Sequence, residues 1–382
     1  MDLLKDIIVI DFSQFLSGPS AGLRLADMGA RVIKIERPGT GDICRQLYVS
    51  DTRIEGESTI FHAINRNKQS YAADLKDAID LEKIKKLIEK ADIVLHNFRP
   101  GVMERIGLDY KTVKQIKPGI IYGEVSGYGS EGPWRDLPGQ DLLVQALSGL
   151  TFLSNNHDQG PTPMGVSVVD ILAGTYLTQG ILAALYRKNA TGQSALVQVS
   201  MMEAILDFQF EVLTCHYNDG RQLPVRSKLS NGNAYIPAPY GIYKTREGYL
   251  SLAMGDIQKL ALLLECSELQ PYDSPAEWFE KRDEIKAILT QHLLLRTADE
   301  WLAILQPADI WCAKVMDYAD LLQQVGYKVL NMELKVKTSN GLSIRTTRCP
   351  IRVDGKIAVS EKGAPLLGEH NTMIDAQFGL VK

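Results

Sequence analysis

Short apolar runs alternate with amphipathic stretches along the first two hundred residues. Each run is four to six residues long, rich in β-branched side chains and bounded by turn-forming residues, which is typical of buried strands. Helical patterns lie between them, after Gly18-Pro19 and at Leu81–Lys90. This alternation predicts right-handed βαβ units on a parallel sheet. The predicted strands are Ile7–Ile10, Arg31–Glu36, Ser70–Asp74, Ile93–His96, Ile120–Val125 and Ala195–Val199.

Two later stretches, Asp141–Leu150 and Asp170–Leu185, are apolar on nearly every side and predict buried helices. The longest uncharged segments, Leu142–His157 and Ile171–Tyr186, are shorter than a membrane span requires. The chain start, Met1-Asp2, does not have the pattern of a secretory signal. We therefore expect a cytoplasmic protein without a membrane partner.

The second half has a different composition. A long helix is predicted from Ser200 toward His216, and Asn218–Tyr243 is rich in Gly, Pro, Asn and Tyr, as linkers are. Beyond it we predict a strand at Tyr249–Ala253, helices at 256–265, 277–292 and 298–306, strands within Val329–Val353 and a last helix at Asn371–Phe378. This layout indicates a large α/β domain, a smaller middle domain and a tail that returns to the first.

Charge and cysteine content exclude several classes of protein. The 42 Lys and Arg residues against 46 Asp and Glu residues leave a net charge of −4, which gives no global basic surface for nucleic acid. The five cysteines are scattered and never form CxxC, so neither a disulfide framework nor a zinc cage is expected. The six histidines show no HExxH spacing, and we expect no metal site.

The turn after the first predicted strand, Asp11–Gly22, contains small residues and leads into a helix N-terminus, where free N–H groups can hold an anion. Glu36 stands where a dinucleotide-binding fold places its ribose-binding acid. However, the chain contains neither GxGxxG nor GxxxxGK[ST], so an NAD site has only topology in its favour. Ser126–Ser130 follows a strand but lacks the pattern of a hydrolase nucleophile.

Basic residues lie near the ends of the predicted strands: Arg37, Lys68, Lys76, Arg99 and Arg105. They are either phosphate ligands or solvated surface. Asp170 is the carboxylate that stands out, either as the N-cap of the apolar helix or as a nucleophile or base in a dry pocket. In the second case the helix N-terminus would favour its ionised form.

Asp11-Phe-Ser, Gly18-Pro19 and the run Leu25–Asp42 resemble the opening of the class III coenzyme A (CoA) transferases, the family of formyl-CoA transferase, carnitine CoA-transferase and the bile-acid-inducible protein F type. The resemblance covers nearly the whole chain and is most specific in its first two hundred residues. It continues through Asn67-Lys68, Asp74-Leu-Lys76, Asn97-Phe-Arg-Pro-Gly101, Ser126-Gly-Tyr-Gly, Gln145-Ala-Leu-Ser-Gly149, Asp170-Ile-Leu-Ala-Gly174, Val199-Ser-Met-Met-Glu203 and Pro365-Leu-Leu-Gly-Glu-His370.

The resemblance implies a large Rossmann-like domain from 1–200 and 330–382, a linker helix region at 201–225, a small α+β domain at 226–329 and an interlocked homodimer. It implies that Asp170 is the catalytic aspartate, which forms an aspartyl anhydride and then an aspartyl-CoA thioester. An acyl-CoA and a small carboxylic acid are the implied substrates, with no permanently bound cofactor. The implied CoA contacts are Phe15, Leu16, Ser17, Arg37, Ala73, Lys76, Asn97, Phe98, Arg105 and Ile106.

Two positions depart from the family pattern and are candidate substrate residues. Leu16 stands where formyl-CoA transferase has Gln, so specificity for formate and oxalate is not expected. Gln140 stands where many relatives have an aromatic residue and where racemising relatives have a histidine. A CoA-transferase is therefore expected, with a 2-methylacyl-CoA racemase or another CoA-ester enzyme as the alternative. Asp170 argues against a third interpretation, a non-catalytic acyl-CoA-binding protein.

Overall fold

The computed structural model describes residues 3–47, 53–54 and 56–380; Met1-Asp2, the chain start considered above, lies outside the described residues. By their internal contacts the residues divide into two compact units. The first unit comprises Met1–Val144, Ser167–Asp207 and Val329–Lys382, and the second comprises Gln145–Val166 and Phe208–Lys328. Residues 145–166 thus group with the second unit, although the sequence-based boundaries assign them to the large domain.

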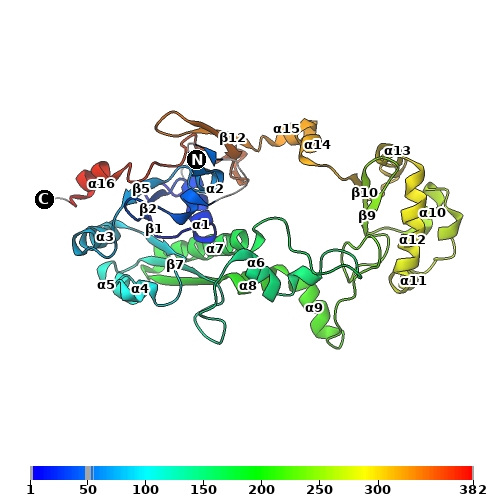
Figure 1. Cartoon of the computed structure of the whole chain (residues 1–382), viewed down its shortest axis with the longest axis horizontal. Coiled ribbons are helices and arrows are strands. Elements are labelled where there is room, and N and C mark those ends of the chain that lie inside the picture. Colours follow the sequence, from blue (N-terminus) through cyan, green and yellow to red (C-terminus); the bar gives the residue numbers. More distant parts are fainter. Residues whose placement is uncertain (1–2, 48–52, 55, 381–382) are drawn as a thin grey trace. The chain divides into compact units, whose positions relative to one another are not determined.

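A six-stranded parallel sheet forms the centre of the first unit, in the order β5-β2-β1-β6-β7-β8 (Figure 1). The α/β prediction is confirmed, and each strand lies within two residues of its predicted bounds. The order reverses between β1 and β6, which makes the carboxyl ends of these two strands the topological switch point of the sheet. The strands are β1 (Ile8–Asp11), β2 (Arg31–Glu36), β5 (Gln69–Ala72), β6 (Ile93–His96), β7 (Ile121–Ser126) and β8 (Ala195–Ser200).

Helices cover both faces of this sheet (Figure 1). On one face α1 (Ser17–Asp27) crosses α7 (Val168–Thr191), and α7 packs on β7 and β8. On the other face, α3 (Ala78–Lys90), α5 (Tyr110–Ile116) and α16 (Asn371–Phe378) contribute Ile84, Val113 and Ile374 to one core cluster with the strands. The short elements are α2 (Thr59–Ile64), α4 (Val102–Arg105) and the strands β3 (Arg53–Ile54), β4 (Glu57–Ser58), β12 (Glu333–Lys337), β13 (Ser343–Thr347), β14 (Arg352–Val353) and β15 (Lys356–Ile357).

The α7 helix is longer than its uncharged segment predicts. Its 24 residues make it long and apolar enough to cross a membrane by length and composition alone, and 44% of its most apolar window is buried. Leu177 and Ile181 pack against the sheet at Gly123, whereas Ile171, Thr175 and Gln179 are exposed. The helix is therefore a core helix on one side only, and the prediction of a fully buried helix is wrong on the other side.

Three other helix predictions require correction. In α6 (Asp141–Leu147) the side chains of Leu142, Leu143 and Leu147 are exposed, so this helix is not buried. The long helix from Ser200 is two helices, α8 (Met201–Phe208) and α9 (Phe210–Asn218), because the backbone at Gln209 (φ −91°, ψ 12°) departs from helical geometry. The helix predicted at 277–292 is likewise split at Lys281.

The second unit is built on a small antiparallel sheet in the order β11-β10-β9. Its core gathers Trp301, Leu289 and Leu250, all of them buried. The strands are β9 (Gly241–Lys244), β10 (Tyr249–Leu252) and β11 (Cys312–Lys314), and the helices are α10 (Ile257–Leu263), α11 (Pro275–Glu280), α12 (Arg282–His292), α13 (Ala298–Leu305) and α14 (Tyr318–Gln323), with α15 (Val325–Leu330) at the boundary to the first unit.

Candidate active site

The turn after β1 and the residue after β6 are joined at the switch point. The Asn97 side chain accepts a hydrogen bond from the backbone N–H of Gln14 (2.8 Å) and donates to the Gln14 carbonyl (2.7 Å). Its amide nitrogen also lies 3.2 Å from the Ser17 hydroxyl. Asn97 therefore holds the Gln14–Ser17 turn at the place where ligands bind in open α/β sheets.

A cavity of about 540 Å³ lies beside this turn, wholly within the first unit. The segment 135–141 and the N-terminus of α7 form its other walls. Both segments carry residues that the sequence singled out, although they are far from β1 and β6 in the chain. Seven of the predicted site residues line the cavity: Phe15, Leu16, Ser17, Asn97, Phe98, Gln140 and Asp170.

Asp170 is the third residue of α7 and not its N-cap, so the capping interpretation is wrong. The cap comes from a distant residue: the backbone N–H groups of Val169 and Asp170 donate to the Asp141 carboxylate at 2.8 and 3.1 Å. Asp141 also lines the cavity. Sequence reasoning noted it only as the first residue of a helix, and no local signal connects it to residues 28 and 29 positions away.

The environment of Asp170 raises its pKa to about 7. Burial is the main cause and the charge of Asp141 adds to it, while hydrogen bonds from the Ser17 hydroxyl and backbone N–H act in the opposite direction. The expectation that the helix N-terminus keeps this group fully ionised is thus wrong at neutral pH. A carboxylate with a raised pKa is more basic and more nucleophilic than an ordinary one, which suits a group that attacks a carbonyl.

A glycine one turn along α7 allows Ser17 to reach Asp170. A Cβ atom on Gly174 would lie 1.8 Å from the Ser20 hydroxyl oxygen and 2.6 Å from the Ser17 carbonyl oxygen. Only a residue without a side chain lets the start of α1 lie this close to α7. Gly127 and Gly139 make a similar close approach, which brings the 135–141 segment against the end of β7.

Five predicted CoA contacts do not line this cavity. Arg37, Lys76 and Arg105 are exposed, Ala73 is buried and Ile106 packs against the core. They follow β2, β5 and β6, so they lie along the same carboxyl edge of the sheet that carries the cavity.

Two candidates from the sequence have structural partners instead. Lys68 is buried and forms an ion pair with Asp11 (Nζ–Oδ2 3.0 Å), so it is neither solvated surface nor free to bind phosphate. Glu36 pairs with Arg45 (Oε1–Nη2 2.8 Å) and also accepts a hydrogen bond from Ser70 (2.6 Å). The Glu36 carboxylate is therefore already engaged and is not available to bind the ribose of a dinucleotide.

Several lining residues escaped the sequence reasoning. Leu47, Ile60, Leu137 and Met201 give the cavity an apolar wall, and nothing in their local pattern distinguishes them from core residues. Arg99 and Arg135 are exposed basic side chains at its margin. The sequence had already singled out Arg99 among the basic residues near strand ends, whereas Arg135 was missed, because only the fold brings it to this cavity.

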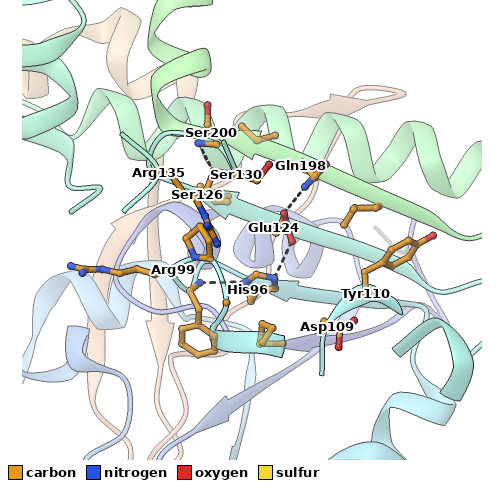
Figure 2. A pocket seen from close by; sticks show the side chains of 18 of the residues that line it. His96, Arg99, Asp109, Tyr110, Glu124, Ser126, Ser130, Arg135, Gln198 and Ser200 are labelled. Carbon is orange, nitrogen blue, oxygen red and sulfur yellow. Dashed lines mark hydrogen bonds and ion pairs between the residues drawn. The ribbon is translucent and has the colours of Figure 1, made fainter. Parts of the chain in front are cut away.

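A second cavity of about 780 Å³ adjoins the first and shares Phe98, Arg99 and Arg135 with it (Figure 2). His96, Glu124 and Gln198 form a row across β6, β7 and β8. His96 Nε2 lies 3.3 Å from Glu124 Oε2, and Gln198 donates to Oε1 at 2.7 Å. Burial raises the pKa of Glu124, but the hydrogen bonds from His96 and Gln198 outweigh it and leave the pKa lowered. His96 thus faces Glu124, and the cavity that contains Asp170 does not include it.

One group in the second unit could hold a metal ion. The ligand atoms of Cys266, Glu268 and His292 lie within 4.8 Å of one another. Burial raises the pKa of the Cys266 thiol, which opposes the thiolate form that metals prefer.

Comparison with known proteins gives consistent matches over the whole chain. Residues 4–371 match the sequence profile of CoA-transferase family III. The chain is 31% identical to the acetyl-CoA:oxalate CoA-transferase of Acetobacter aceti, over 97% of this chain and 95% of that protein. It is 29% identical to the succinyl-CoA:glutarate CoA-transferase of Mus musculus, over 98% and 86% of the two chains.

Solved structures agree with these sequence matches. A CAIB/BAIF family protein from Brucella suis superimposes with a TM-score of 0.85 at 29% identity, covering 98% of this chain and 99% of that chain. Rv3272 from Mycobacterium tuberculosis, in its orthorhombic crystal form, gives a TM-score of 0.83 at 29% identity, with coverages of 97% and 98%.

Proposed function

The chain belongs to CoA-transferase family III, and from that premise we propose that this transferase moves CoA from an acyl-CoA thioester to a carboxylic acid through covalent intermediates on Asp170. The observation that carries the proposal is the place of Asp170. It lies in a cavity at the switch point of the sheet, with Ser17 as hydrogen-bond donor and a pKa raised to about 7.

The first half-reaction loads CoA onto the enzyme. The Asp170 carboxylate attacks the thioester carbonyl, the C–S bond breaks, and the CoA thiolate leaves an acyl-aspartyl anhydride behind. The thiolate then attacks the aspartyl carbonyl of that anhydride and releases the donor acid as its carboxylate. The enzyme now carries CoA as an aspartyl thioester, and no net proton has been taken up or lost.

The second half-reaction is the reverse sequence with another acid. The acceptor carboxylate attacks the aspartyl thioester, which forms a second anhydride and frees the thiolate. Attack of the thiolate on the acceptor's acyl carbonyl gives the new CoA ester and regenerates the Asp170 carboxylate. Because water would hydrolyse each anhydride, the apolar wall of Leu47, Ile60, Leu137 and Met201 serves to limit water in the cavity.

Developing negative charge requires hydrogen-bond donors. Ser17, the first residue of α1, directs its N–H and hydroxyl groups toward Asp170. Gln140 adds a side-chain amide to the same cavity, whereas the Asn97 amide is engaged with Gln14 and Ser17. These donors serve the oxyanions of both half-reactions.

The CoA moiety is held along the sheet edge in this proposal. Arg37, Lys76 and Arg105 supply positive charge for its phosphates after β2, β5 and β6. Ala73, Phe98 and Ile106 lie along the same edge, and the Phe15–Ser17 turn receives the thioester end.

The acceptor acid binds while Asp170 carries CoA as a neutral thioester, so the negative charge that it meets in the cavity is that of Asp141. A second carboxylate therefore requires compensating positive charge, which Arg99 and Arg135 can supply. The relatives named above act on oxalate or glutarate, and we propose a small dicarboxylic acid as one of the substrates here.

The racemase alternative has less support. Racemisation next to a thioester needs a second acid–base group opposite the aspartate, and among the described residues no histidine lines the cavity around Asp170. Gln140 stands at the decisive position, and its amide does not titrate near neutral pH. We propose that the enzyme works in the cytoplasm, where thiols stay reduced, because all five cysteines are free.

One experiment tests both functions. The purified enzyme is incubated with succinyl-CoA and hydroxylamine, and peptides are read by mass spectrometry, with a 2-methylacyl-CoA in deuterated water as the second arm. We expect a hydroxamate at Asp170 in the wild type, none in Asp170→Asn, and no deuterium at the α-carbon. Labelling at another carboxylate, or undiminished transfer by a folded Asp170→Asn, would refute the nucleophile. Rapid deuterium uptake by the wild type would favour the racemase, and loss of that uptake in His96→Ala would identify His96 as the second acid–base group.

A further inference from the structure

Buried charged side chains hold the backbone just before Ser17. The Asp11 carboxylate accepts from the N–H of Ser13 (2.9 Å), and the Lys34 ammonium donates to the Ser13 carbonyl (2.6 Å). The Asp42 carboxylate accepts from the N–H of Phe15 (3.2 Å). Two groups from separate parts of the chain, Lys34 and Asp42, therefore join the nearby Asp11 in holding one turn.

This turn has a conformation that it would not keep by itself. Phe15 has φ of +61°, in the left-handed region that a bulky residue rarely occupies. Such a conformation persists only where the surroundings over-determine it. Phe15 donates its N–H to Asp42, and Lys34 donates to the carbonyl of Ser13, two positions earlier.

Lys34 and Asp42 form a fully buried ion pair, with Nζ–Oδ2 at 2.7 Å. Burial alone would lower the pKa of Lys34, but the charges of Asp42, Asp11 and Glu36 outweigh it and raise the pKa, so the ammonium stays charged. A buried ion pair of this kind is weak evidence for stability, because apolar residues of similar volume are often at least as stable. The pair therefore calls for another explanation.

The turn leads directly to the donors of the reaction. Ser17 lies two residues after Phe15, and its hydroxyl and N–H groups hydrogen-bond Asp170. We propose that Lys34 and Asp42 are positioning residues for CoA transfer, which fix the Gln14–Ser17 turn so that Ser17 stays within reach of Asp170. This inference rests on the proposed role of Asp170 as the nucleophile.

The chain offers a matched control pair. Arg66 and Asp27 are also buried and form an ion pair through two hydrogen bonds, one of them between Nη2 and Oδ2 at 2.8 Å. This pair joins the end of α1 to the segment after α2. Among the described residues neither side chain bonds to the Gln14–Ser17 turn, so its removal tests the general cost of losing a buried ion pair.

The experiment compares Lys34→Met/Asp42→Asn with Arg66→Met/Asp27→Asn. Both double variants keep charge balance and approximate volume, and their thermal stabilities are measured first. In the Lys34 variant we expect kcat to fall by about a hundredfold, as a small misplacement of reacting groups does, while KM for the acyl-CoA rises by less than about tenfold. In the control variant we expect kcat within about threefold of the wild type.

Two further variants keep the test decisive. If the Lys34 double variant is insoluble, Asp42→Asn, which retains an acceptor oxygen, is compared with Asp27→Asn, and a fall in kcat of about tenfold is expected only in the first. Equal losses of kcat in the two members of either comparison would overturn the positioning role. Asp170→Asn separates the two hypotheses: if it still transfers CoA, the proposed nucleophile is wrong, whereas a positioning failure leaves Asp170→Asn inactive.

Discussion

At the scale of the residue, the reactivity of Asp170 depends on its pKa, which burial and a small number of neighbouring groups determine. Its carboxylate has Ser17 as a donor and Asp141 as a negative neighbour, and burial adds to the cost of ionisation. The balance raises its pKa to about 7, so a modest change in pH changes the fraction that can attack a thioester.

We predict that kcat/KM follows this ionisation. Because the attacking form is the carboxylate, activity should rise with pH and level off above about 7, falling about tenfold per pH unit on the acid side. A pH–rate profile with a stable acyl-CoA and saturating acceptor measures it. An acid limb near pH 4 would contradict the raised pKa.

The raised pKa of Asp170 also affects the stability of the protein, and this effect can be measured independently of activity. An acid whose folded-state pKa is raised loses stability as pH rises from about 4, its unfolded value, to about 7. Asp170→Asn removes this loss and should be more stable than the wild type at pH 8, by about 1 to 2 kcal/mol once solvent screening is discounted. At pH 4 the gain should vanish in thermal unfolding experiments.

A second prediction at this scale concerns the phosphate ligands. Arg37→Ala and Lys76→Ala should raise KM for the acyl-CoA by about tenfold and change kcat little, because these exposed side chains are remote from the reacting carbonyl. Lys90→Ala, at the exposed C-terminal end of α3, is the control. An unchanged KM in both variants would return Arg37 and Lys76 to solvated surface.

At the scale of the element, the site is the crossing of two helices. The start of α1 carries Ser17 and the start of α7 carries Asp170, and they meet where Gly174 leaves room. Asp141, from the 135–141 segment, caps α7 and thereby ties a third segment to the same point. The catalytic geometry therefore depends on packing between helices more than on any one loop.

Gly174→Ala tests this dependence. The new Cβ would meet the Ser17 backbone oxygen, which cannot turn aside, so the helices must separate and kcat should fall at least about tenfold, with stability lowered by about 1 to 3 kcal/mol. The control is Gly180→Ala on the same helix, where the new Cβ would meet only the Val197 side chain. Equal effects of the two variants on kcat would show that separation of α1 from α7 is unimportant.

At the scale of the whole molecule, large apolar side chains remain exposed on helices of both units. In the first unit α7 exposes Ile171 and Tyr186, and in the second α9 exposes Phe210 and Tyr217. Apolar patches of this kind mark interaction surfaces. We propose that a second copy of the chain covers them, as the interlocked homodimer expected from the sequence requires.

The proposed homodimer can be tested directly by measuring the mass of the protein in solution. Light scattering at micromolar concentration should give twice the chain mass of 42.4 kDa, and Tyr186→Glu should weaken the association because it places a charge in an apolar contact. Lys86→Glu, at an exposed position of α3, is a matched surface control. A wild type that scatters as a single chain would contradict the homodimer.

Local patterns in the sequence were sufficient for the architecture. The strands β2 and β6 and the helix α16 have the bounds that their residues predict, because burial on both faces requires continuous β-branched runs and caps mark helix ends. Local patterns also singled out the Asn97–Gly101 motif, because it directly follows a strand, and Asp170, because it leads an apolar helix. These features depend on neighbours within a few residues.

Only the tertiary structure decided which distant groups meet. Nothing in the local sequence distinguishes Lys34 and Lys68 from surface lysines, yet both lie buried in ion pairs with Asp42 and Asp11. Asp141 likewise caps a helix that begins 27 residues later. A hydrophobic pattern states which face of an element is buried, not which charged group from another segment it will contact. The pKa of Asp170 and the geometry of its donors come from such contacts, and for that reason they could be learned only from the folded chain.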